Sequence, residues 1–137
     1  MLELYIHLAD VLSIKAGMGN RLCAAYAAGD KAALKEIAEK EIPSCMEKIK
    51  EYKRCREEIW DSESKIFGYE VLDIRLGGLL SRMETAQRRL KNYLTGRLDK
   101  LPELEEARLP YRPVKDGEEH KLCSCNSWRM IVSASPV

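Results

Sequence analysis

Apolar side chains recur at alternating steps of three and four residues in three separate stretches of the chain. Such steps keep side chains on one face of an α-helix and produce the narrow seam of a bundle or coiled coil. The clearest stripe lies between residues 68 and 101 and consists of Leu72, Leu76, Leu79, Met83, Ala86, Leu90, Tyr93, Leu94, Leu98 and Leu101. A single helix cannot bury its own stripe, so this pattern predicts partner helices elsewhere in the chain.

The first 28 residues carry a second stripe with the same steps. Its members are Leu2, Tyr5, Ala9, Leu12, Ala16, Gly19, Cys23 and Tyr26. Gly17 and Gly19 weaken the middle of this helix by about 1 kcal/mol each relative to alanine. They indicate either a kink or a close approach of another backbone. Gly29 is a suitable C-terminal cap, and the helix is expected to end beside it.

The third stripe follows Asp30, which is a good N-cap residue. Its members are Leu34, Ile37 or Ala38, Ile42, Cys45 or Met46, Ile49, Tyr52, Cys55 and Ile59. Pro43 lies inside the stripe and removes one backbone hydrogen bond, so we expect a kink or break between Glu41 and Ser44. Ser44 could cap a restarted helix, with Glu47 as its capping-box partner.

Three stripes joined by short connections predict an all-α, up-down-up three-helix bundle. We expect the bundle to occupy residues 1–110, with helices at about 2–28, 30–62 and 69–100. Residues 111–137 are expected to form an irregular, partly extended tail, because prolines interrupt helical patterns after Lys100. Residues 128–135 alternate like a single β-strand. A lone strand has no ladder to join in a helical bundle, so a sheet or groove outside this chain, or a missing segment, is expected to complete it.

Composition excludes several classes of protein. Hydrophobic residues make up 45% of the chain and charged residues 33%, which is too apolar for a disordered protein. The 23 basic and 22 acidic residues are well mixed and give a formal net charge of +1, so no nucleic-acid or anionic-membrane partner is predicted. No apolar run approaches about 18 residues, and the first residues lack the features of a signal peptide. The odd number of cysteines favours a reducing, cytoplasmic setting.

Candidate chemistry is sparse. His120, Cys123 and Cys125 form an H-x-x-C-x-C cluster, but structural zinc requires four ligands, so loop thiols without a function are the plainer interpretation. No Glu-x-x-His pair, phosphate-binding loop or local cysteine–histidine signature occurs. Adjacent carboxylates such as Glu57 and Glu58 are typical of solvated helix faces. The sequence therefore predicts neither a catalytic residue nor a cofactor.

The connection between the second and third helices gathers aromatic and charged residues. This cluster consists of Trp60, Lys65, Phe67, Tyr69, Glu70, Asp73 and Arg75. These side chains either cap the open end of the bundle core or form a docking surface, because aromatic residues and arginine are enriched at the centres of interfaces.

The same region resembles a known family. The run from Phe67 to Leu79, Phe-Gly-Tyr-Glu-Val-Leu-Asp-Ile-Arg-Leu-Gly-Gly-Leu, is similar to the C-terminal helical domain of bacterial glycoside hydrolase family 20 enzymes, which are exo-acting β-N-acetylhexosaminidases. The segments 8–12, 24–31 and 128–135 agree with it. The resemblance therefore covers almost the whole chain.

The resemblance implies a non-catalytic role. In that family an Asp–Glu pair performs catalysis on a (β/α)₈ barrel that precedes the helical domain, and such a barrel needs about 250 residues. No catalytic residue can therefore be assigned here, and the chain is expected to be a domain excised from a longer polypeptide. Its expected partners are the upstream barrel and a second copy in a homodimer, with residues 65–70 near the catalytic mouth. The alternative is a self-contained helical interaction protein without an enzymatic parent.

Overall fold

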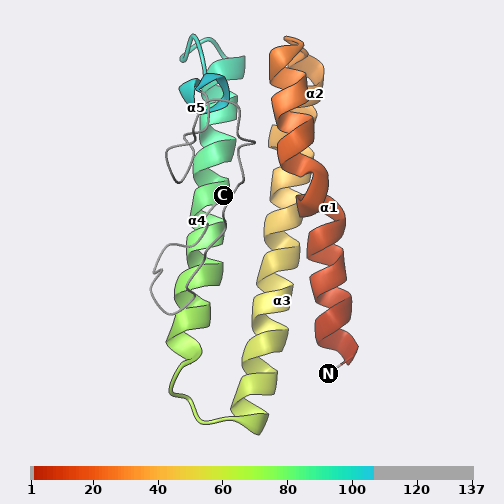
Figure 1. Cartoon of the computed structure of the whole chain (residues 1–137), viewed down its shortest axis with the longest axis vertical. Coiled ribbons are helices and arrows are strands. Elements are labelled where there is room, and N and C mark those ends of the chain that lie inside the picture. Colours follow the sequence, from red (N-terminus) through yellow and green to blue (C-terminus); the bar gives the residue numbers. More distant parts are fainter. Residues whose placement is uncertain (1, 107–137) are drawn as a thin grey trace, which may run out of the picture.

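The computed structural model describes residues 2–106, and the chain in this range is a helical bundle without strands (Figure 1). Its elements are α1 (Leu2–Ala27), α2 (Lys31–Glu36), the π-helical segment η1 (Ile37–Glu41), α3 (Ile42–Glu63), α4 (Tyr69–Leu94) and α5 (Pro102–Glu105). The predicted all-α, up-down-up bundle is confirmed. None of the described helices has both the length and the apolar content needed to span a bilayer. The predicted tail and its candidate strand lie outside the described residues.

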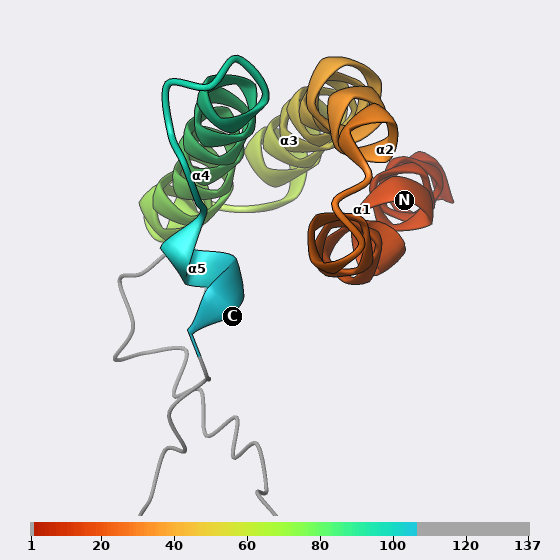
Figure 2. The same ribbon diagram turned by 90° about the horizontal axis from the view of Figure 1, so that it is seen from above.

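The middle rod of the bundle is formed by α2, η1 and α3, which follow one another without a break. Figures 1 and 2 show α1 on one side of α3 and α4 on the other, and α3 packs against both. Seen from above, α5 lies beside α4 on the side that faces α1. The side of α1 that points away from α3 is therefore uncovered by any described element.

The hydrophobic core occupies one half of the bundle. It contains residues 11–25 of α1, residues 34–49 of the middle rod, residues 83–90 of α4, and Leu101. The buried side chains are Val11, Met18, Ala25, Leu34, Ile37, Ala38, Ile42, Cys45, Ile49, Met83, Leu90 and Leu101. Cys55 and Tyr69 are also buried but lie outside this cluster, in the half that ends at the α3–α4 connection.

The predicted stripe of α1 lies on the exposed side of the helix, except for Tyr26, which packs against the core. Leu2, Tyr5 and Leu12 are 76%, 60% and 49% exposed, whereas Val11 and Met18, which lie on another face, are buried. Apolar residues occur on both faces of α1, so periodicity alone does not identify the buried one. A side chain built on Gly19 would meet nothing within 4 Å, so no described part of the chain packs closely against the backbone there. Figure 1 shows instead that the ribbon of α1 changes direction near its middle.

Pro43 does not break the middle rod, which excludes one of the two outcomes expected there, a kink or a break. Ser44 lies inside α3 and does not restart a helix. The backbone widens before the proline instead: the Ile42 N–H donates to the carbonyl of Ile37, five residues earlier, as in a π-helix. This places the local irregularity at Ile37–Glu41, one turn earlier than predicted.

Glycines in the left-handed conformation follow two of the long helices. Gly29 has a φ of 66° and follows α1, as its sequence position predicted. Gly96 has a φ of 73° and ends α4 at Leu94, earlier than the predicted end near residue 100. Leu98 and Leu101 still pack on the core, but from the turn after α4 and not from the helix itself.

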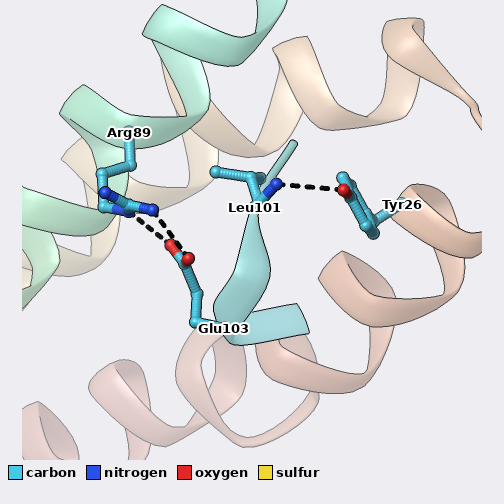
Figure 3. A network of polar contacts seen from close by, with 4 residues as sticks. All are labelled: Tyr26, Arg89, Leu101 and Glu103. Atoms are coloured by element: carbon cyan, nitrogen blue, oxygen red, sulfur yellow. Dashed lines mark hydrogen bonds and ion pairs between the residues drawn. The ribbon is translucent and has the colours of Figure 1, made fainter. Parts of the chain in front are cut away.

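Short polar contacts fasten α5 across the bundle (Figure 3). The Leu101 backbone N–H donates to the Tyr26 hydroxyl at 3.0 Å. That hydroxyl in turn donates to a carboxylate oxygen of Glu105 at 2.6 Å. Arg89 on α4 donates two hydrogen bonds to the carboxylate of Glu103, one of them 2.7 Å long. These contacts connect α5 to both α1 and α4.

Candidate functional site

The candidate site is the α3–α4 connection, whose shape depends on Trp60 and Tyr69. The Trp60 indole Nε1–H donates to the Lys65 carbonyl at 2.7 Å, and the two aromatic rings lie 5.7 Å apart between centroids. The Arg56 guanidinium lies 5.6 Å from the centroid of the Trp60 ring, within cation–π range. These contacts fold the chain back from α3 into α4.

Tyr69 is the most buried member of the cluster. Its side chain is 5% exposed, and its hydroxyl donates to the Lys53 carbonyl at 3.4 Å. Burial, together with the nearby carboxylates of Glu57 and Asp73, raises the pKa of the Tyr69 hydroxyl. The hydroxyl therefore remains protonated at neutral pH and serves as a donor that ties α4 to α3.

The acidic residues of the cluster are engaged in local contacts. A Glu70 carboxylate oxygen accepts a hydrogen bond from the Gly68 N–H at 2.8 Å, which caps the start of α4. Gly68 has a φ of 98°, a conformation that L-residues rarely adopt. The Asp73 carboxylate lies 2.8 Å from the Lys53 ammonium. These carboxylates stabilise the connection and are not arranged as a general acid and base.

Two side chains at the tip of the connection project into solvent. Phe67 is 84% exposed and Ile66 is 63% exposed. Val71 and Ile74 on the first turns of α4 are about half exposed as well. Sequence reasoning included Phe67 but missed Ile66, although the signal was available: two adjacent apolar residues beside a glycine that starts a helix.

The remaining predicted site residues divide between surface and interior. Lys65 is exposed, whereas Arg75 on α4 is half-buried. The connection can offer the apolar side chains at its tip, Ile66 and Phe67, to another surface. The hydrogen bonds and the ion pair described above hold its backbone in place. Within residues 2–106 no three His, Cys, Asp or Glu side chains form a group that could hold a metal ion. His120, Cys123 and Cys125 lie outside the described residues.

A comparison with known protein families identifies the family of this chain. The sequence matches the family described as the Glycoside Hydrolase 20C C-terminal domain over residues 1–124. The chain belongs to this family. The match covers every described residue and confirms the resemblance that residues 67–79 indicated. A search of curated proteins gave no match.

Proposed function

We propose that this chain is the non-catalytic C-terminal helical domain of a β-N-acetylhexosaminidase, an enzyme that hydrolyses terminal N-acetylhexosamine residues. The observation that carries the proposal is the family match over residues 1–124. The carboxylates of Glu70 and Asp73 make contacts that hold the connection together, and this supports a non-catalytic role. Hydrolysis would be performed by the barrel that precedes this domain.

The role proposed for the domain is mechanical. It packs on the catalytic barrel of the same polypeptide and stabilises the active conformation of the barrel. The α3–α4 connection contributes a second contact, either at the catalytic mouth or with a second copy of the enzyme. Phe67 and Ile66 support this, because an apolar tip held by Trp60 and Tyr69 is already ordered for binding and loses little entropy on contact.

A direct test uses the complete reading frame that contains this chain. The full polypeptide should release N-acetylglucosamine from a chromogenic substrate, whereas the 137-residue chain alone should not. Deleting the domain should lower the activity or the thermal stability of the enzyme. A reading frame without a preceding catalytic domain would overturn the proposal.

The contact proposed for the connection is tested with Phe67→Ser. Phe67 is the more informative position, because replacing the buried Tyr69 would also damage the fold. In the full enzyme Phe67→Ser should change kcat/KM or weaken dimerisation, while Lys35→Ser, at an exposed position on α2, should change neither. If Phe67→Ser matches the wild type in both assays, the connection only closes the end of the bundle.

An interaction protein without an enzymatic parent is the second candidate. The observation in its favour is the exposed apolar face of α1, on which Leu2 and Tyr5 are more than half exposed. The length of the reading frame separates the two functions, since only the hydrolase domain requires several hundred residues upstream.

We also propose a reducing, cytoplasmic setting. Cys45 and Cys55 are buried free thiols, and Cys23 is an exposed free thiol. Buried thiols pack as small apolar side chains and need no oxidising compartment.

A further inference from the structure

The first helix carries an apolar seam that no described part of the chain covers. We define the outer face of α1 by the residues that lie along this seam. They are Leu2, Tyr5, Ala9, Leu12, Ala16, Gly19 and Cys23. All of them are exposed, and Ile6 beside them is 53% exposed. Among the exposed residues of α1 only Glu3 and Arg21 are charged, although a third of the chain is charged.

Two charged residues of α1 pair with the middle rod. The Asp10 carboxylate lies 3.5 Å from the Lys48 ammonium of α3, and the Arg21 guanidinium pairs with Glu41 of η1. A helix at the surface of a soluble protein normally turns its charges to water. A helix that is apolar on both sides is typical of a buried position. The composition of α1 therefore indicates that its outer face is covered in the working protein.

The seam has the spacing of a helix-packing surface. Its members follow steps of three and four over the length of α1, as in a heptad repeat. Its last three members, Ala16, Gly19 and Cys23, are small, and a side chain built on Gly19 would meet nothing within 4 Å. Another helix could approach the backbone of α1 closely at these positions.

We infer that the outer face of α1 docks on an apolar, helical surface of the catalytic domain that precedes it in the same polypeptide. This inference rests on the proposed function. Leu2 begins α1 and is itself a member of the outer face. Asp10 and Arg21 of α1 already pair with Lys48 and Glu41 inside the domain, which leaves mainly apolar side chains as the recognition elements.

The size of the outer face favours this covalently attached neighbour over a second copy. The seam is about 33 Å long at 1.5 Å per residue, and a helix is about 10 Å wide. Docking would therefore cover about 330 Å² on each side, or about 660 Å² in total. Free association usually requires about 1,200–2,000 Å² in total. Contacts between domains of one chain begin near 600 Å², because the linkage supplies an effective concentration in about the millimolar range.

Cys23 provides a natural probe of this contact, because its thiol lies on the outer face and is exposed in the chain alone. The experiment compares maleimide labelling of Cys23, located by peptide mass mapping, in the 137-residue chain and in the full enzyme. Labelling should be at least about 10-fold slower in the full enzyme, since a well-packed interface excludes reagent and water alike.

Leu12→Lys and Ile74→Lys form a matched pair for the same assay. Both residues are 49% exposed in the chain, but only Leu12 lies on the outer face of α1. Leu12→Lys should restore fast labelling of Cys23 in the full enzyme, because it places an unpaired charge in an apolar contact. Ile74→Lys should leave labelling slow. Circular dichroism of both variants in the 137-residue chain should show unchanged helix content, which excludes unfolding as the cause.

Three other results would overturn the inference. Equal labelling of Cys23 in both proteins would show that the outer face stays free, while the proposed function would stand. A dimer of the 137-residue chain that Leu12→Lys dissociates would identify a second copy as the occupant. A reading frame without a catalytic domain would remove the proposed function and this inference together.

Discussion

A single glutamine compensates for the proline in the middle rod. The carbonyl of Ala38 would normally accept a hydrogen bond from residue 42 or, in a π-helix, from residue 43. Ile42 donates to Ile37 instead, and Pro43 has no N–H. The Gln87 side chain of α4 donates to the Ala38 carbonyl at 2.7 Å and satisfies it. One side chain thus joins α4 to the rod at the point where the helix is irregular.

Replacing Gln87 with alanine should therefore destabilise the bundle. The Ala38 carbonyl would be left without a partner in a partly buried position, and such a loss costs about 1–3 kcal/mol. In a Pro43→Ala background the same replacement should cost less, because residue 43 then supplies an N–H of its own. Urea denaturation of the four proteins gives the coupling energy between the two sites. If Gln87→Ala lowered the free energy of unfolding equally in both backgrounds, this account would be contradicted.

The described cysteines should differ sharply in reactivity. Burial raises the pKa of the Cys45 thiol, and only the thiolate form attacks alkylating reagents. We expect rapid alkylation of the exposed Cys23 in the folded chain, and alkylation of Cys45 and Cys55 only after denaturation. Time-resolved labelling with peptide mass mapping measures this. Fast labelling of Cys45 under native conditions would show that the core half of the bundle opens readily.

At the scale of elements, α5 is too short to be stable by itself. Its four residues begin after Leu101, which provides no side-chain cap. The helix is held by contacts with the bundle, namely the buried Leu101 side chain, the Tyr26 hydroxyl and the Arg89–Glu103 pair. Its attachment should therefore depend on the charge of Glu103.

The Arg89–Glu103 pair predicts a dependence of stability on acid pH. Hydrogen bonds from Arg89 lower the pKa of the Glu103 carboxyl below its usual value of 4.5, although partial burial opposes this shift. A lowered pKa in the folded state means that the stabilisation is fully present above pH 4.5 and is lost as the pH falls through the lower folded value. The difference in the midpoint of thermal unfolding between the wild type and Arg89→Gln should be constant above pH 4.5 and should become smaller in acid.

A matched control for this measurement is Lys40→Gln. Lys40 pairs with Glu36 within the rod at 3.4 Å, and both side chains are mostly exposed, so removing this pair should change stability little. A gap between the wild type and Arg89→Gln that stays the same down to pH 2 would show that Arg89 acts through packing and not through the Glu103 carboxylate.

Sequence patterns predicted some elements well and failed on others for identifiable reasons. The stripe of α4 is confirmed, since Met83 and Leu90 are buried while Glu84 and Arg88 between them are exposed. The stripe of α1 was wrong because the charges that mark the wet side of a helix are paired inward there, as Asp10 with Lys48 shows. The position of the π segment depends on a carbonyl contact with α4, which no local pattern contains.

The candidate site shows the same limit on a smaller scale. Composition grouped Trp60, Phe67 and Tyr69 into one cluster, but two of these residues contact each other while Phe67 is 84% exposed. The difference arises from Gly68, whose positive φ turns the chain between Phe67 and Tyr69. Residue type indicated an aromatic cluster, and backbone geometry decided which ring was left outside.

At the scale of the whole molecule, the core is concentrated in one half of the bundle. The core cluster draws its buried residues of the middle rod and α4 from 34–49 and 83–90, whereas Cys55 and Tyr69 are buried outside it. The opposite half contains the exposed apolar side chains at the start of α1, at the connection and on the first turns of α4. Every exposed large apolar residue in the described part of the chain falls within residues 2–12 or 66–74. The two halves should therefore differ in local stability.

Native-state hydrogen exchange of the 137-residue chain should reveal this division. Segments with few buried apolar contacts open more readily than the core, so amides within residues 2–10 and 69–76 should exchange faster than those within 42–49 and 83–90, by about 10-fold or more. Mass spectrometry of peptic fragments measures the rates. Uniform protection along the long helices would contradict the division. In the full enzyme the amides of residues 2–10 should become protected, because docking of the outer face of α1 would supply the contacts that this half of the bundle lacks.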